Sequence, residues 1–84
     1  MTIQLRYFAS VREAIGRAEE SLDTRAATLA ALRDELIARG EPHAGALARG
    51  RAVRIALNQV MVRDEATPLT DGAEVAFFPP VTGG

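Results

Sequence analysis

The last ten residues of the chain, VAFFPPVTGG, join the end of a strand to an unusual reactive group. The apolar run from Val75 to Phe78 has the composition of a buried strand, and Pro79 and Pro80 end it because they lack a backbone N–H and fix φ. A diglycine follows, and residues without a Cβ can pass a narrow channel and let a catalytic group approach. The reactive group that this pattern predicts is the α-carboxylate of Gly84.

The residues after Phe78 are predicted to form a tail that the fold presents to another protein. We divide the chain into a folded domain, residues 1–78, and an extended C-terminal tail, residues 79–84, which includes Val81, Thr82 and Gly83. The prolines stiffen the root of this tail toward polyproline geometry. In extended conformation the tail reaches roughly 20 Å, which is enough to enter an active site of another protein.

The carboxylate of Gly84 needs activation before a nucleophile can displace one of its oxygens. The most direct route is an acyl-adenylate made by an ATP-using enzyme, from which a sulfur or an amine displaces AMP. The chain has no cysteine, so any sulfur that it transfers must be carried on this carboxylate as a thiocarboxylate. The tail therefore predicts a carrier rather than an enzyme.

Composition excludes most other chemistry. A chain of 84 residues is long enough for one globular domain. Its formal net charge of −1 argues against the positively charged surface that binds nucleic acid. Without cysteine and with a single histidine, it is expected to hold no metal, no bound cofactor and no catalytic triad. No stretch approaches the ~18 apolar residues of a membrane span, and a signal-peptide pattern is lacking, so we expect a cytoplasmic protein that does not contact membranes.

The first part of the chain predicts a strand, a short helix and an edge strand. Residues 2–9 alternate between apolar and polar types, which is the period of a half-buried strand. Ser10 and Glu13 have the spacing of a capping box at the start of a short helix, and Gly16 is placed to end it. Residues 17–23 are predicted as a strand at the edge of a sheet, because charged residues suit an edge.

The stretch TLAALRDELIARG, residues 28–40, is the clearest helix in the sequence. Thr28 is the predicted N-cap, Glu35 and Arg39 an i,i+4 ion pair, and Gly40 the residue that ends the helix. One apolar stripe is expected to cover a sheet, and it consists of Leu29, Leu32, Leu36 and Ile37.

The second half predicts a loop, a hairpin and a last strand. Residues 40–52 are rich in glycine and are expected to form a loop with a helical turn near residues 44–48, in which His43 is exposed to solvent. Asn58 and Gln59 are the predicted two-residue turn between two strands. Leu69 is expected to fill the core before the last strand, residues 73–78.

This order of elements predicts an α+β fold in which a mixed sheet of about five strands packs on one main helix. The ubiquitin-like β-grasp is its most economical form, with the first and last strands side by side in the middle of the sheet. The predicted core side of the strands consists of Ile3, Leu5, Tyr7, Val53, Ile55, Leu57, Val60, Val62, Val75 and Phe77.

The opposite face of the sheet contains three large apolar residues that a solvated face does not need, Phe8, Met61 and Phe78. If the first and last strands are neighbours, Phe8 and Phe78 lie together where the tail begins. Aromatic and methionine side chains in such a cluster are typical of an interface. Arg12 on the adjoining turn is a candidate to pair with a carboxylate of the partner.

The segments YFASVREAIG, NQVMVRD and PLTDGAEVAFFPPVTGG resemble the family of small, sulfur-carrier subunits of molybdopterin synthase. The resemblance spans essentially the whole chain and is most specific over residues 68–84. It implies a non-catalytic subunit of a heterotetramer, with an interface at Phe8, Arg12, Met61 and Phe78. Two departures from the family pattern are the loop 40–52 and a methionine at position 61, where a branched aliphatic residue is common.

The resemblance also implies the chemistry of the tail. An E1-like enzyme uses ATP to adenylate Gly84, and a sulfur donor converts it to a thiocarboxylate. The large catalytic subunit then receives the tail, Pro79 to Gly84. Sulfur passes there to cyclic pyranopterin monophosphate to build the dithiolene of molybdopterin.

Three other functions remain open on the sequence alone. A sulfur carrier for thiamine thiazole synthesis shares the fold and the diglycine. A ubiquitin-like modifier would join Gly84 to lysines through isopeptide bonds. A plain interaction domain would be indifferent to loss of Gly84, whereas either carrier would lose all function.

Overall fold

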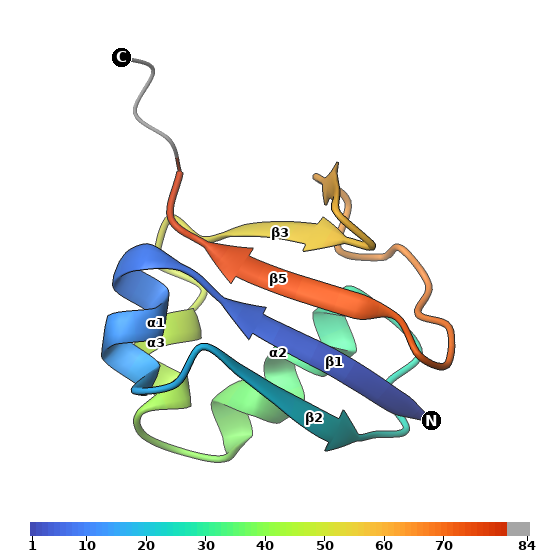
Figure 1. Cartoon of the computed structure of the whole chain (residues 1–84), viewed down its shortest axis with the longest axis horizontal. Helices are drawn as coiled ribbons and strands as arrows, with labels where there is room; N and C mark the ends of the chain where they lie inside the picture. Colours follow the sequence, from blue (N-terminus) through green and yellow to red (C-terminus); the bar gives the residue numbers. More distant parts are fainter. Residues whose placement is uncertain (81–84) are drawn as a thin grey trace.

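One five-stranded sheet, in the order β2-β1-β5-β3-β4, forms the body of the protein in the computed structural model, which describes residues 1–80 (Figure 1). The two central strands, β1 (Thr2–Tyr7) and β5 (Glu74–Phe78), are parallel. The others pair antiparallel with their neighbours and are β2 (Glu19–Asp23), β3 (Arg54–Leu57) and β4 (Val60–Val62). The predicted β-grasp arrangement and the edge position of residues 17–23 are both confirmed.

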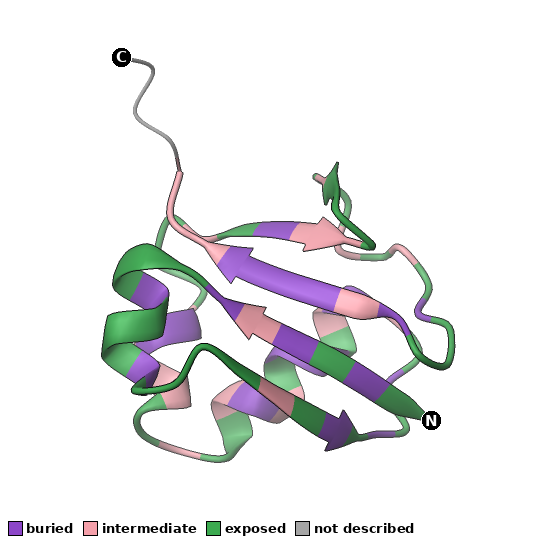
Figure 2. Cartoon of the chain, viewed as in Figure 1, coloured by how far each residue is buried: buried purple, intermediate pink, exposed green. Residues whose placement is uncertain are grey.

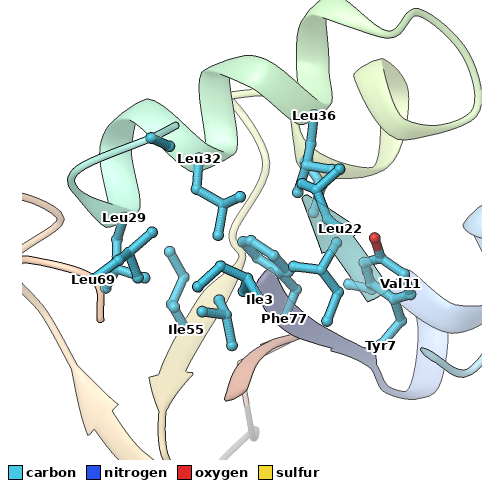
Figure 3. Packing of buried hydrophobic residues seen from close by; sticks show 14 of the residues in the cluster. Ile3, Tyr7, Val11, Leu22, Leu29, Leu32, Leu36, Ile55, Leu69 and Phe77 are labelled. Carbon is cyan, nitrogen blue, oxygen red and sulfur yellow. The ribbon is translucent and has the colours of Figure 1, made fainter. Parts of the chain in front are cut away.

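Three helices cover one face of this sheet (Figure 1). They are α1 (Ala9–Ile15), α2 (Leu29–Ala38) and α3 (His43–Leu47). Leu29, Leu32 and Leu36 of α2 are fully buried and point at the inner side of the central strands (Figure 3). None of the helices within residues 1–80 is both long enough and apolar enough to span a bilayer.

The caps of α2 follow the sequence prediction, but its ion pair does not. The Thr28 hydroxyl accepts the N–H of Ala31 at 3.2 Å, and Gly40 follows the helix with a φ of +86°. The expected pair between Glu35 and Arg39 is absent from the described residues. Glu35 instead accepts the hydroxyl of Thr24 at 2.6 Å, and Arg39 turns to the sheet, so tertiary partners replace the local one.

The predicted capping box of α1 is also wrong. Phe8, not Ser10, is the N-cap, and no side chain caps this end. The helix begins earlier because Ala9, with a φ of +49°, turns the chain sharply directly after the strand. Gly16 ends α1 as predicted, since its φ is +89° and its N–H donates to the carbonyl of Arg12 at 2.8 Å.

The inner side of the sheet holds the core that alternation predicted, with one error. Six of the predicted residues are buried and three are partly buried against the core: Ile3, Leu5, Tyr7, Ile55, Val75 and Phe77, then Val53, Leu57 and Val62. Val60 was predicted as core but is 66% exposed. It lies on the short edge strand β4, which is largely exposed in Figure 2.

The structure confirms the predicted hairpin turn and the predicted burial of Leu69. Asn58 and Gln59 have φ values of 50° and 70°, the positive pair that a type I′ turn requires. Asn58 also fixes the start of β5, because its N–H donates to the carbonyl of Glu74 and its Oδ1 accepts the Glu74 N–H at 3.0 Å. Leu69 is buried, with 8% of its surface exposed.

His43, predicted to be an exposed loop residue, lies instead in a polar cluster under the sheet. Its Nε2 is 3.0 Å from Oε2 of Glu20, and its ring packs edge-on against Tyr7. The same carboxylate accepts the Tyr7 hydroxyl at 2.9 Å and Arg39 Nη1 at 2.8 Å. The prediction failed because Glu20 and His43 are 23 residues apart and meet only in the folded chain.

Candidate functional site

The end of β5 delivers the tail beside the turn between β1 and α1 (Figure 1). The parallel register pairs Tyr7 with Phe77, so the next residues along each strand, Phe8 and Phe78, are neighbours. The Phe8 N–H donates to the carbonyl of Phe77 at 3.1 Å, which continues the ladder by one step. The predicted meeting of Phe8 and Phe78 at the root of the tail is therefore confirmed.

Three side chains form what we call the outer patch, Phe8, Met61 and Phe78, on the face away from the helices. Phe8 is 42% exposed and Met61 is 59% exposed, while Phe78 is half-buried. Met61 is joined to the centre of the sheet through a row of small residues, because Ala56 pairs with both Met61 and Ala76.

Arg6 extends the outer patch with a charge. Its guanidinium carbon lies 5.3 Å from the centre of the Phe8 ring, a cation–π contact. Its Nη1 is 3.9 Å from the Glu74 carboxylate. The Nε of Arg6 is buried and has no hydrogen-bond partner among residues 1–80, so this face of the sheet contains an unsatisfied hydrogen-bond donor.

Two further arginines border the outer patch on the other side. Arg54 pairs with Phe78, and Arg63 directly follows β4, next to Val62, which pairs with Ile55. With Met61, Phe78 and Pro80 they line a hollow of about 590 Å³ beside the tail root. Neither arginine has an ion-pair partner within the described part of the chain.

Arg54 and Arg63 thus bring positive charge next to exposed apolar surface. The sequence analysis did not single them out. The sequence feature that could have identified these two arginines is their equal separation, in residues, from the Asn58–Gln59 turn.

A second hollow, of about 390 Å³, adjoins the root at Pro79 and is lined in part by Ser10, Val11 and Arg51. Arg12 lies on α1, the helix that starts directly after Phe8, and makes no ion pair within residues 1–80. Its charge is thus available to a partner.

The loop beneath the tail root is held by a buried arginine. Arg33 is 4% exposed, and it donates to the carbonyls of Leu47 and Ala48 at the end of α3 at 2.8 and 3.0 Å. It also pairs with Glu65 at 3.0 Å, and Arg49 binds the other oxygen of that carboxylate at 2.7 Å. Carbonyls that end a helix need such donors, so this cluster fixes where the following loop begins.

The described residues contain no group of three or more side chains suited to hold a metal ion. Of the predicted site, the structure places Phe8, Arg12, Met61, Phe78 and the two prolines around one end of the sheet. The remaining predicted tail positions, Val81, Thr82, Gly83 and Gly84, lie outside the described residues.

Comparison with known proteins gives consistent matches over the whole chain. The ThiS family matches residues 5–84. The molybdopterin synthase sulfur carrier subunit of Escherichia coli (strain K12) is 44% identical over 82 residues, which cover 98% of this chain and 99% of that protein. Small archaeal modifier protein 3 of Haloferax volcanii is 35% identical over 98 residues and is covered completely, as is this chain.

A solved structure shows a similar chain together with a partner. The complex of subunits 1 and 2 of the molybdopterin-converting factor from Helicobacter pylori 26695 matches with a TM-score of 0.70 and 28% identity, and both chains are covered completely.

Proposed function

The chain belongs to the ThiS family, and we propose that it is the sulfur-carrier subunit of a molybdopterin synthase. The observation that carries the proposal is the position of the tail root. The central strand β5 ends at Phe78, within the outer patch, and Pro79 and Pro80 follow it, so a protein that covers the outer patch also receives the tail. The near full-length identity to the Escherichia coli carrier supports the same function.

In this proposal the folded domain, residues 1–78, is the part that the partner binds, and it contributes no catalytic residue or bound cofactor of its own. The partner's surface covers Phe8, Met61 and Phe78, and Arg12 pairs with one of its carboxylates. The prolines limit the directions in which residues 79–84 can leave the sheet, because their φ angles are fixed. Because the root of the tail is rigid, the tail loses less conformational entropy when the partner binds it.

The reacting group is the carboxylate of Gly84, and its chemistry has two steps. In a cytoplasmic E1-like enzyme, a carboxylate oxygen attacks the α-phosphorus of ATP, and pyrophosphate leaves. A hydrosulfide ion supplied by a donor then attacks the acyl carbon and displaces AMP, and loss of the sulfur-bound proton yields the thiocarboxylate. In the large catalytic subunit this sulfur is transferred to cyclic pyranopterin monophosphate, and water takes its place at the acyl carbon, which restores the carboxylate.

Intact-mass measurement tests the proposal directly. With the activating enzyme, ATP and a sulfur source, the protein should gain the mass difference between sulfur and oxygen, and the large subunit with the precursor should reverse that gain. A variant without Gly84 should show no change. Gly50→Ala is a suitable control, because a Cβ at position 50 meets nothing within 4 Å. An unchanged mass under conditions in which a known carrier reacts would refute the proposal.

Protein modification is the second candidate function, and the identity to small archaeal modifier protein 3 favours it. A modifier would form amide-linked conjugates that persist in reducing buffer, whereas a sulfur carrier would not. A carrier for thiamine thiazole synthesis would restore growth of a thiamine-requiring strain instead of molybdenum-enzyme activity. These readouts separate the three functions.

A further inference from the structure

The positive charge of this protein is supplied entirely by arginine. All ten of its lysine or arginine positions are arginine, and cysteine is absent as well. The 84 residues thus offer no side-chain amine and no thiol. Amines and thiolates are the side-chain groups that attack an activated acyl carbon most readily.

The other polar side chains do not substitute for them. The arginine guanidinium stays protonated in proteins and is not a nucleophile at neutral pH. Serine and threonine hydroxyls need an adjacent base to react. The only histidine is bound to Glu20 inside the polar cluster at 3.0 Å.

The remaining amine is the α-amino group of Met1, and the fold keeps it away from the tail. It donates to the carbonyl of Thr24 at 3.0 Å and lies 3.6 Å from the Asp23 carboxylate. Because β1 and β5 are parallel, Met1 is beside the start of β5, and the tail leaves from the other end. An extended stretch from Met1 to Phe8 spans about 23 Å, which exceeds the roughly 20 Å reach of a tail that starts beside Phe8.

We infer that this protein is a donor whose side chains cannot act as acceptors. Its activated Gly84 reacts with groups of another molecule, and the protein forms neither a self-closed ring nor chains of its own copies linked through side chains. The inference rests on the proposed function, because the absence of side-chain amines and thiols matters only when the C-terminus is activated. If the protein also modifies other proteins, each acceptor amine receives a single copy that no further copy can extend through a side chain.

The test uses the full chain with its C-terminal carboxyl prepared chemically as a thioester, so that no activating enzyme is needed. Two matched variants add one lysine each at exposed positions. Arg51→Lys places an amine in the hollow that Pro79 also lines, and Arg25→Lys places one in the hollow beside Met1, far from the tail. In each reaction the lysine Nζ attacks the thioester carbon, a C–N bond forms, and the thiol leaves as the amine loses a proton.

With its Met1 amine acetylated, the wild-type thioester should only hydrolyse, while added Nα-acetyl-lysine should still form an amide with it. Arg51→Lys should form an internal amide at a rate independent of protein concentration. Arg25→Lys should form only linked dimers, about 100-fold more slowly at ~10 µM protein, since a tethered amine has an effective concentration on the order of 1 mM.

An amide-linked product from the acetylated wild-type chain would overturn the inference, and so would an Arg51→Lys chain that only hydrolyses. Neither result bears on the proposed function, because no activating enzyme takes part. That function is refuted separately if the activating enzyme, ATP and a sulfur source leave the mass of the protein unchanged.

Discussion

Replacing Glu20 by glutamine should remove a large part of the stability of this domain at neutral pH. The Glu20 carboxylate accepts hydrogen bonds from Tyr7 on β1 and from Arg39 at the end of α2, and it contacts His43 on α3, all between 2.8 and 3.0 Å. Its side chain is 9% exposed. One carboxylate therefore connects the sheet to two of the helices that cover it.

The pKa of Glu20 gives the size of the effect. Burial alone would raise this pKa, but hydrogen bonds from Arg39, His43 and Tyr7 outweigh burial and lower it from 4.5 to about 2. At about 1.4 kcal/mol per pKa unit, this shift corresponds to roughly 3 kcal/mol. Since the folded-state pKa is lowered, this stability is fully present above about pH 4.5 and is lost as the pH falls toward 2.

Urea unfolding of the wild type and of Glu20→Gln between pH 7 and pH 2 measures this contribution. We expect a gap of about 3 kcal/mol at pH 7, or a fall in Tm on the order of 15 °C for a domain of this size, and a gap that closes toward pH 2. Other carboxylates titrate equally in both proteins and cancel. Glu19→Gln, an exposed neighbour on the same strand, is the matched control and should change stability by less than about 0.5 kcal/mol.

Two results would refute this reasoning. One is a Glu20→Gln protein as stable as the Glu19→Gln control at pH 7. The other is a gap that stays constant from pH 7 to pH 2, because the loss would then come from packing and not from the charge of the carboxylate.

Three further outcomes are expected. Gln59→Gly should raise the free energy of unfolding by about 0.5–1 kcal/mol in urea melts, since glycine adopts the φ of 70° without strain. Arg33→Met should lower it by about 2–4 kcal/mol, because two helix-end carbonyls and a carboxylate lose their buried donor. Met61→Asp should weaken binding of the large subunit at least 10-fold by calorimetry with an unchanged Tm, as a charge enters the apolar contact. Val60→Asp, equally exposed but on the other side of the strand, should bind as the wild type does.

Much of the candidate site was predictable because it depends on short-range rules. Alternation placed Phe8, Met61 and Phe78 on the face opposite the core, and two prolines after an apolar run ended the last strand. Once the first and last strands were taken as neighbours, the tail root and two of these residues had to lie together. The charges around them were not predictable in the same way, since Arg54 and Arg63 line one hollow with Phe78 only once the hairpin has folded beside β5.

The sequence by itself determined the caps of α2 and the hairpin turn, but not the N-cap of α1. Thr28, Gly40 and the Asn58–Gln59 turn acted as predicted, because a cap or a positive φ is a local requirement. Tertiary structure alone decided which charges meet. Glu20 and Arg39 are 19 residues apart, and their pairing displaced the local Glu35–Arg39 pair because a partly buried partner, screened less by water, outweighs an exposed neighbour on the same helix.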